Sequence, residues 1–221
     1  PESIAEHIVD NVRFVVNCAA FTDVDGAEDQ ETTAHKLNAE AVGHLAEHCK
    51  NIGATLIHYS TDYVFDGKAE TPYPTNHPRD PLNAYGRTKA AGEQLIETSG
   101  CDYILIRTSW LYAPWARNFV GTMIRLTRER DELQVVDDQR GRPTSAQHLA
   151  LASLGLLEKG ERGPFHVTDG GECTWFDFAC EIKRLAGNTC DIKPCSSDQY
   201  KLPAARPAYS VMDLSKTESA L

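Results

Sequence analysis

The sequence predicts an α/β fold, in which a parallel β-sheet is covered by helices on both faces. Short apolar runs alternate in the first half of the chain with longer segments of helical period. The intervening helices are long enough to connect neighbouring parallel strands by right-handed crossovers. After about residue 110 the elements become shorter, which predicts a smaller C-terminal lobe at the carboxyl end of the sheet, where open α/β folds bind ligands.

The first predicted strand is the apolar run RFVVNCAA at residues 13–20, whose small residues indicate a turn. A helix is predicted at 29–49, where apolar residues recur with a helical period before a stop at Gly53. The run ATLIHYS at 54–60 predicts a second strand. Four prolines between residues 66 and 82 then predict an ordered loop.

The segment LNAYGRTKAAGEQLIE at residues 82–97 predicts a helix that ends near Gly100, and a third strand is predicted at 102–108. The tail from residue 187 is predicted to be irregular, because it contains three of the prolines. The elements predicted between them are a helix at 118–130, a short apolar run at 133–136, a turn at 137–143, a helix at 145–158, a strand at 164–168 and a helix at 174–186.

Composition restricts the class of protein. The chain has 221 residues, is 41% hydrophobic and carries a formal net charge of −10, without any run of Lys or Arg. An acidic surface repels phosphate backbones, so we expect no nucleic-acid and no membrane partner. The seven scattered cysteines predict free thiols in a reducing compartment. With no signal peptide and no long apolar run, the sequence predicts a soluble, cytoplasmic protein.

No metal site is expected. His44 and His48 fit the zinc-peptidase pattern H-x-x-E-H, but no third ligand is apparent, and both fit a helix that packs through its apolar residues. Two carboxylate pairs are interpreted as turn or cap residues rather than acid–base dyads, namely Asp23 with Asp25 and Asp137 with Asp138.

A possible catalytic group surrounds Tyr85 and Lys89, which are four residues apart and therefore share one helical face. The alternative for this pair by itself is a surface contact. Ser60 and Thr61, however, end the second predicted strand, where the sheet meets its crevice. A strand-end hydroxyl, a tyrosine 24 residues later and a lysine four residues further resemble the short-chain dehydrogenase/reductase superfamily, in its extended, nucleotide-sugar-modifying branch.

The chemistry of ketone reduction explains these residue types. The reaction needs a hydride from a nicotinamide and a proton for the developing alkoxide. The pKa of a free phenol, near 10, is too high for efficient proton transfer at neutral pH, and a nearby ammonium lowers it. We therefore expect Tyr85 to act as the acid and Lys89 to lower its pKa and bind the cofactor ribose. Thr61 would hold the substrate carbonyl.

The residue after Asp62 favours reduction over dehydration. In the sugar-nucleotide dehydratases that this chain resembles, Thr-Asp-Glu supplies the carboxylates for elimination, whereas here Tyr63 stands in place of the glutamate.

Most of the chain resembles the dTDP-4-dehydrorhamnose reductase family. The resemblance implies a Rossmann-like fold, NADPH as cofactor (NADH is possible), a dTDP-sugar substrate and a possible homodimer. It implies cofactor contacts by Asn17, Ala19, Ala20, Ser60, Tyr85 and Lys89, and substrate contacts by Val24, Tyr63, Trp110 and Arg206. A core-packing role for Trp110 is an equal alternative. The matching segments are VVNCAAFTDVDGAE (15–28), LNAEAVGHLAE (37–47), STDYVFDG (60–67), PLNAYGRTKAAGE (81–93), ILIRTSWLYA (104–113), VVDDQRGRPTSAQHLA (135–150) and ARPAYSVMDLSK (205–216).

Two domains follow from this resemblance: a partial dinucleotide-binding domain with the catalytic residues at 1–110, and mainly a substrate-binding lobe at 111–221. The Gly-rich turn of a dinucleotide site is not found, and the match begins at the family's fourth strand. We therefore expect an N-terminally truncated sheet with an apolar edge, and a fragment of a longer protein.

Two alternatives stay open. One is a non-catalytic relative, similar to the regulatory subunit of methionine adenosyltransferase, which would use the exposed sheet edge to bind a protein. The other is a reductase of a different nucleotide 4-ketosugar, which would differ only in the shape of its pocket.

Overall fold

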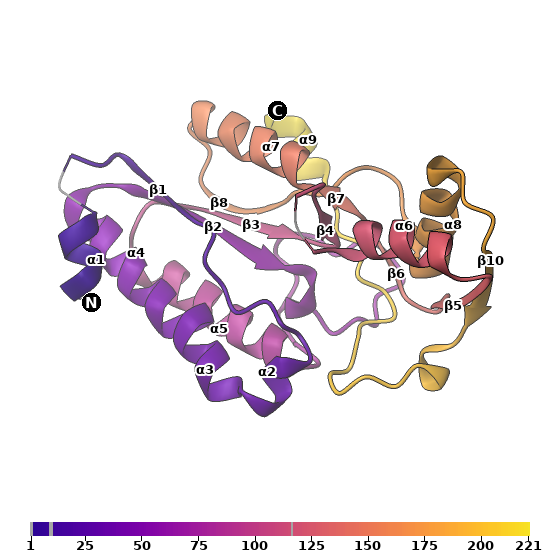
Figure 1. The fold of residues 1–221 in the computed structure, drawn as a ribbon. Helices are drawn as coiled ribbons and strands as arrows, with labels where there is room; N and C mark the ends of the chain where they lie inside the picture. Colours follow the sequence, from indigo (N-terminus) through magenta and orange to yellow (C-terminus); the bar gives the residue numbers. More distant parts are fainter. Residues whose placement is uncertain (1, 9–10, 116) are drawn as a thin grey trace.

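The computed structural model describes residues 2–8, 11–115 and 117–221. Its central sheet has the strand order β1-β2-β3-β8, and each neighbouring pair is parallel (Figure 1). The predicted parallel sheet is therefore confirmed. The four strands are β1 (Phe14–Asn17), β2 (Thr55–Thr61), β3 (Tyr103–Thr108) and β8 (Gly163–His166).

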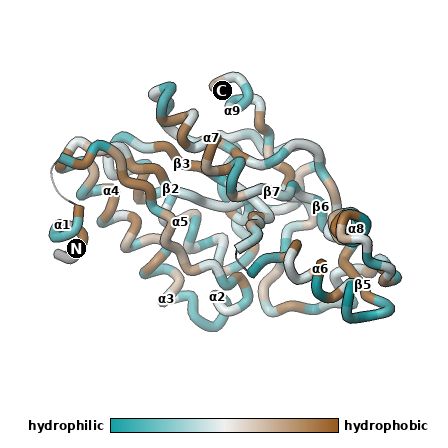
Figure 2. The backbone as a smooth tube through the Cα atoms, turned by 45° about the horizontal axis from the view of Figure 1, so that its top comes forward, coloured by the Kyte–Doolittle hydropathy of each residue, from teal (hydrophilic) through white to brown (hydrophobic). Residues whose placement is uncertain are grey.

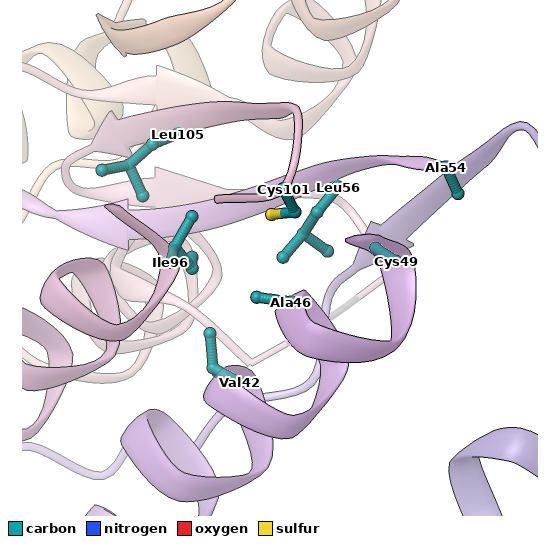
Figure 3. Close-up of a cluster of buried hydrophobic side chains, with 8 residues drawn as sticks. All are labelled: Val42, Ala46, Cys49, Ala54, Leu56, Ile96, Cys101 and Leu105. Carbon is teal, nitrogen blue, oxygen red and sulfur yellow. The ribbon is translucent and has the colours of Figure 1, made fainter. Parts of the chain in front are cut away.

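Helices cover both faces of this sheet, with α4 (Ala41–Ile52) and α5 (Ala84–Ser99) on one face and α7 (Ala146–Glu158) on the other (Figure 1). The short α9 (Ser215–Ala220) lies beside α7. Side chains alternate along each strand, so Leu56 and Leu105 pack with α4 and α5 (Figure 3), whereas their sequence neighbours pack with α7. Both faces are thereby buried, which explains why β3 is hydrophobic along most of its length (Figure 2).

The predicted helix at 29–49 is instead a series of shorter helices. These are α2 (Gly26–Asp29), α3 (Glu31–His35), the π-helical turn η1 (Lys36–Glu40) and then α4. In η1 the fully buried Asn38 accepts a hydrogen bond from the Phe21 backbone N–H at 2.8 Å and donates to the Phe21 carbonyl at 3.0 Å. The irregular turn therefore anchors the segment that follows β1.

A second hydrophobic cluster lies apart from the sheet and contains α6 (Phe119–Glu129), β5 (Glu132–Val136) and α8 (Trp175–Ala186). The prediction of an irregular tail from residue 187 onward is wrong for residues 191–195. These residues form β10 (Asp191–Cys195), which pairs in parallel with β5. Pro194 suggested a loop, but a proline is tolerated in this strand because β10 is at the edge of a two-stranded sheet.

Several short elements were not predicted. Strands of two residues are too short to show a hydrophobic period. The unpredicted strands are β4 (Leu111–Tyr112), which pairs with β7 (Thr144–Ser145), and β6 (Arg140–Gly141), which pairs with β9 (Cys173–Thr174). The unpredicted helices are α1 (Glu2–His7), η2 (Asp62–Val64) and η3 (Ser197–Gln199).

Strand β1 forms one edge of the central sheet, and its Phe14 and Val16 are 41% and 50% exposed, as the apolar-edge prediction requires. Across residues 2–8, 11–115 and 117–221, none of the helices has both the length and the hydropathy of a membrane span.

Candidate active site

A cleft of about 610 Å³ lies at the carboxyl ends of β1, β2 and β3. The structure brings together ten of the eleven predicted site residues in its lining. These are Asn17, Ala19, Ala20, Val24, Ser60, Thr61, Tyr63, Tyr85, Lys89 and Trp110. Residues up to 93 positions apart in sequence therefore face one cavity, as the parallel topology predicts.

The first turn of α5 places Tyr85 and Lys89 in the cleft. Asn83 caps this helix, because its side-chain oxygen accepts from the Gly86 N–H at 2.8 Å. A Cβ on Gly86 would lie 2.2 Å from the Tyr63 carbonyl oxygen, so glycine allows α5 to approach the turn after β2.

Thr61 connects the end of β2 to its neighbours. Its hydroxyl donates to Asp62 Oδ1 at 3.0 Å, and its oxygen accepts from the Tyr63 N–H at 3.1 Å. A side-chain hydrogen bond also joins Thr61 to Tyr85 and lowers the pKa of the tyrosine. Thr61 is thus held beside the predicted acid.

The pKa of Tyr85 is raised to about 12, mainly by burial and then by the Asp62 charge, against the smaller effect of Thr61. The three contributions to this pKa are burial, the Asp62 charge and the Thr61 hydrogen bond, and the effect of Lys89 on Tyr85 stays a prediction. Tyr85 therefore keeps its proton at neutral pH, which suits a proton donor.

Lys89 is 2% exposed and donates from Nζ to the Tyr59 carbonyl at 2.7 Å, while its Nζ lies 3.2 Å from His58 Nε2. Burial lowers the pKa of Lys89 to about 8, although the charge of Glu93 opposes this shift. The sequence analysis missed His58, although it lies in the same HYST run as Ser60 and Thr61.

The segment after β1 forms the opposite wall of the cleft. Asn17 accepts from the Ala19 N–H at 3.1 Å, and its amide nitrogen lies 3.0 Å from His58 Nδ1. Ser60 is 5% exposed and its hydroxyl helps to lower the pKa of Glu93, so it lies between the cleft and the buried Glu93 carboxylate.

Trp110 lines the cleft and also packs against other aromatic rings, so the packing alternative is confirmed and the substrate contact stays a prediction. Its ring stacks on Trp175 with a centroid distance of 3.5 Å and an interplanar angle of 12°. Trp110 also has a φ of 46°, a left-handed conformation that is rare for a bulky residue. Trp175, at the start of α8, was missed because it is distant in sequence from every recognised motif.

Arg206 lies outside the cleft lining but close to it. Its guanidinium donates to both oxygens of Asp25 at 2.6 Å, and it is hydrogen-bonded to the Tyr63 side chain. Asp25 lies in the turn at the N-cap position of α2, as predicted, and its side chain is in addition the ion-pair partner of Arg206. Asp23 does act as a turn residue and accepts from the Gly26 N–H at 2.9 Å.

The histidines of the H-x-x-E-H pattern have other contacts. His44 lies 3.9 Å from Glu47, and His48 Nε2 lies 2.8 Å from the Ile8 carbonyl oxygen. Within the part of the chain that the structure describes, no three His, Cys, Asp or Glu side chains are grouped as metal ligands.

Comparisons with known proteins agree with this geometry. The chain is 42% identical to dTDP-4-dehydrorhamnose reductase of Streptomyces griseus, over 99% of this chain and 73% of the relative. It is 44% identical to a probable dTDP-4,6-dihydroxy-2-methyloxan-3-one 4-ketoreductase of Streptomyces antibioticus, over 95% of this chain and 71% of the relative. The crystal structure of dTDP-4-dehydrorhamnose reductase from Bacillus anthracis in complex with NADP matches with a TM-score of 0.91 and 38% identity, over 94% of this chain and 74% of that chain.

The family model described as the RmlD substrate binding domain matches residues 1–221. This match and the identities above lead to one conclusion: the chain belongs to the RmlD substrate binding domain family.

Proposed function

We propose that this chain transfers a hydride from NADPH to the C4 ketone of dTDP-4-dehydro-L-rhamnose and forms dTDP-L-rhamnose, a precursor of surface polysaccharide. The observation that carries the proposal is the placement of Thr61, Tyr85 and Lys89 in one cleft at the carboxyl end of the sheet. The names of the relatives support the substrate, and the NADP complex of the Bacillus anthracis enzyme supports the cofactor.

The cleft fits the nicotinamide end of such a cofactor. Asn17, Ala19 and Ala20 form one wall, and Lys89 is the buried basic group expected beside a ribose hydroxyl. The bound cofactor would supply the hydride, since no side chain in the cleft is a hydride donor.

The protein's own groups would supply the proton. Tyr85 is a phenol at neutral pH, and it would donate this proton to the substrate oxygen as that oxygen gains negative charge. Thr61 would hold the same oxygen by a hydrogen bond, because its hydroxyl is fixed by Asp62 and the Tyr63 N–H.

The remaining assignments belong to the substrate. Val24, Tyr63 and Trp110 would contact the sugar, and Arg206 would lie near the nucleotide. The proposed boundary near residue 110 would separate the partial dinucleotide-binding domain from the substrate-binding lobe, whose Trp175 also lines the cleft. Homodimer formation and a cytoplasmic location belong to the same proposal, and sedimentation equilibrium tests the first.

The first test compares the wild-type chain with Tyr85→Phe in an NADPH oxidation assay with dTDP-4-dehydro-L-rhamnose. Loss of the acid should lower kcat by about 10²-fold or more, while the circular dichroism spectrum stays unchanged. Tyr103→Phe, on β3 and away from the cleft, is the control and should keep full activity. Equal turnover by Tyr85→Phe and wild type would refute the role of Tyr85.

A titration with NADPH, followed by nicotinamide fluorescence, separates catalysis from binding. Saturable binding together with turnover supports the proposal. Saturable binding without turnover of any dTDP-4-ketosugar would instead favour the non-catalytic alternative.

A second candidate substrate is another dTDP-4-ketosugar, because the 44% identical relative is named as a reductase of a different dTDP sugar. The two candidates differ in the value of kcat/KM for each substrate, measured with the same chain. A higher kcat/KM for dTDP-4,6-dihydroxy-2-methyloxan-3-one would replace dehydrorhamnose as the preferred substrate.

A further inference from the structure

A chain of hydrogen bonds leads from the backbone after β1 to Lys89. The Ala19 N–H donates to Asn17 Oδ1 at 3.1 Å, which fixes the orientation of the Asn17 amide. The other end of this amide, Nδ2, lies 3.0 Å from His58 Nδ1, and His58 Nε2 lies 3.2 Å from Lys89 Nζ. Lys89 Nζ also donates to the Tyr59 carbonyl at 2.7 Å.

The donors and acceptors in this chain can be assigned in order. Since Asn17 Oδ1 accepts, its Nδ2 is a donor, and His58 Nδ1 has to accept. A neutral imidazole that accepts at Nδ1 carries its proton at Nε2, so His58 Nε2 is a donor. Its neighbour Lys89 Nζ accepts such a bond only as a neutral amine, because an ammonium group has no lone pair.

We propose that His58 is a positioning residue, which Asn17 holds in the Nε2–H tautomer and which stabilises the amine form of Lys89. The inference about protonation stands on the hydrogen-bond geometry alone. Its consequence for turnover rests on the proposed function, since it assigns the balance between amine and ammonium at a catalytic lysine.

Burial favours the neutral forms of both groups. His58 and Lys89 are 1% and 2% exposed, and burial lowers the pKa of both, to about 8 for Lys89, so its amine and ammonium forms are both accessible near that pH. When Lys89 is charged, it lowers the pKa of His58 further, so the two groups do not carry a positive charge together. Glu93, on the same helix as Lys89, raises the pKa of Lys89. The other titratable groups that line the cleft with Lys89 are Cys18, Tyr59, Asp62, Tyr63 and Tyr85.

The proposed catalytic role gains a second step from this arrangement. When Tyr85 has donated its proton, the phenolate has to regain one before the next turnover. Lys89 lines the same cleft as Tyr85, its ammonium and amine forms are both accessible near pH 8, and the His58 Nε2–H would stabilise the amine that remains after Lys89 gives up a proton. Water would then protonate this amine and leave hydroxide, so the net step moves one proton from water to the phenolate.

The direct test is a long-range ¹H–¹⁵N NMR spectrum of the histidine rings in the cofactor-free chain. His58 should show a protonated Nε2 and an unprotonated Nδ1 between pH 6 and 8. His166 is the internal reference, because it should show the opposite tautomer. Its Nε2 lies 3.3 Å from the Arg107 guanidinium, and its Nδ1 lies 3.2 Å from the Asp213 carbonyl oxygen. An Nδ1–H tautomer or an imidazolium at His58 would overturn the proposal.

Two substitutions of Asn17 test the effect on Lys89. Asn17→Asp replaces the donor with an acceptor of the same shape, so His58 should carry a proton at Nδ1. The pKa of Lys89, measured by a ¹³C titration of its side chain, should then rise by about one pH unit. Asn17→Leu removes the donor without adding charge, and it should weaken the Nε2–H preference and raise the same pKa.

The two variants separate the loss of the Asn17 hydrogen-bond donor from the addition of a negative charge at this position. A raised Lys89 pKa in Asn17→Asp alone, with the His58 tautomer unchanged in both variants, would mean that only the added carboxylate acts, and the proposal would fail. The NMR results do not depend on turnover, so they stand even if the proposed reductase activity is not observed. If the wild type is active, the basic limb of its pH–rate profile should move upward in both variants.

Discussion

At the scale of single residues, Asp62 is a buried carboxylate that the proposed mechanism uses. Burial of its charged form lowers the stability of the fold. It is 3% exposed and lies between Thr61 and Tyr63 at the floor of the cleft. Burial raises its pKa to about 6, despite hydrogen bonds from Ser210 and Thr61 that favour the carboxylate. The charge of Asp62 in turn raises the pKa of Tyr85 and helps to keep this residue protonated. The burial of Asp62, although it costs stability, therefore supports Tyr85 as the proposed acid.

Replacement of this carboxylate should make the chain more stable at neutral pH. Because the pKa of Asp62 is higher in the folded chain than its usual 3.8, the folded state binds the proton more tightly, and stability falls as the pH rises from about 4 to about 6. Asp62→Asn should therefore raise the free energy of unfolding at pH 7, by at most about 3 kcal/mol. The measurement is urea denaturation at pH 4 and pH 7, and the gain should disappear at pH 4.

Asp66 provides a control, because its replacement should change the free energy of unfolding in the opposite direction. Its pKa is lowered, first by a hydrogen bond from the Tyr73 hydroxyl, so the folded state favours its charge. Asp66→Asn should lower stability at pH 7. A loss of stability at pH 7 in Asp62→Asn as well would contradict the assignment of Asp62 as an unfavourably buried charge.

At the scale of elements, the position of α5 decides the site. Its N-cap Asn83 also donates to the Ala205 carbonyl at 2.8 Å, which connects the helix start to the C-terminal tail. Gly92 allows a second close approach, because a Cβ there would lie 2.0 Å from the Asn38 carbonyl oxygen of η1. The helix is thus fixed at Gly86 against the turn after β2 and at Gly92 against η1.

Gly86→Ala should destabilise the chain and also lower turnover. The new Cβ would overlap the Tyr63 carbonyl oxygen, so α5 would have to move away from β2. We expect a loss of about 1–3 kcal/mol in the free energy of unfolding and a fall in kcat, because Tyr85 moves with the helix. Thermal unfolding and the NADPH oxidation assay measure the two effects.

Gly121→Ala on α6 is the matched control. Gly121 occupies the same third helical position, and its N–H is also bonded to an N-cap asparagine, at 3.0 Å. Among the residues that the structure describes, a Cβ there would meet Asn118 Oδ1 alone, at 3.9 Å, so the substitution should stabilise α6 by about 0.5–1 kcal/mol. Equal destabilisation by both substitutions would show that the close approach at Gly86 is not the cause.

At the scale of the whole molecule, the tail returns to the first loop. Arg206 and Asp25 are 181 positions apart, and their bidentate pair, with the Ala204 N–H as a further donor to Asp25, joins the tail to the segment after β1. Trp175 on α8 and Trp110 after β3 make a second long-range contact at the cleft. The cleft is therefore enclosed by parts of the chain from both halves of the sequence.

Asp25→Asn should weaken this connection in a pH-dependent way. The hydrogen bond from Arg206 is the main reason that the pKa of Asp25 is lowered, so the pair stabilises the fold above the usual pKa of 3.8, and the effect is lost as the pH falls through the folded value. We expect a loss of about 1 kcal/mol at pH 7 and almost none near pH 2. Chemical denaturation at the two pH values measures the difference.

The exposed Arg125–Glu129 pair on α6 is the control for this prediction. Glu129→Gln should change stability by no more than a few tenths of a kcal/mol, because an exposed i,i+4 pair contributes little. A similarly small effect of Asp25→Asn would mean that the tail is held by packing instead.

The sequence by itself determined the parallel sheet and most of the cleft. Alternating apolar runs and helical periods located β2, β3 and α5, since these patterns are local. The spacing of Tyr85 and Lys89 predicted their common face, the strand end predicted that Thr61 would meet them, and the family resemblance predicted the same of Asn17.

Only the tertiary structure decided the properties that depend on burial and distance. The pKa of Tyr85, the partner of Arg206, the stacking of Trp110 on Trp175 and the contact between His58 and Lys89 all arise between segments far apart in sequence. Strand β10 likewise exists because β5 is there to pair with it. A charge or hydrogen bond acts over a few ångströms in space, and a one-dimensional pattern does not contain those distances.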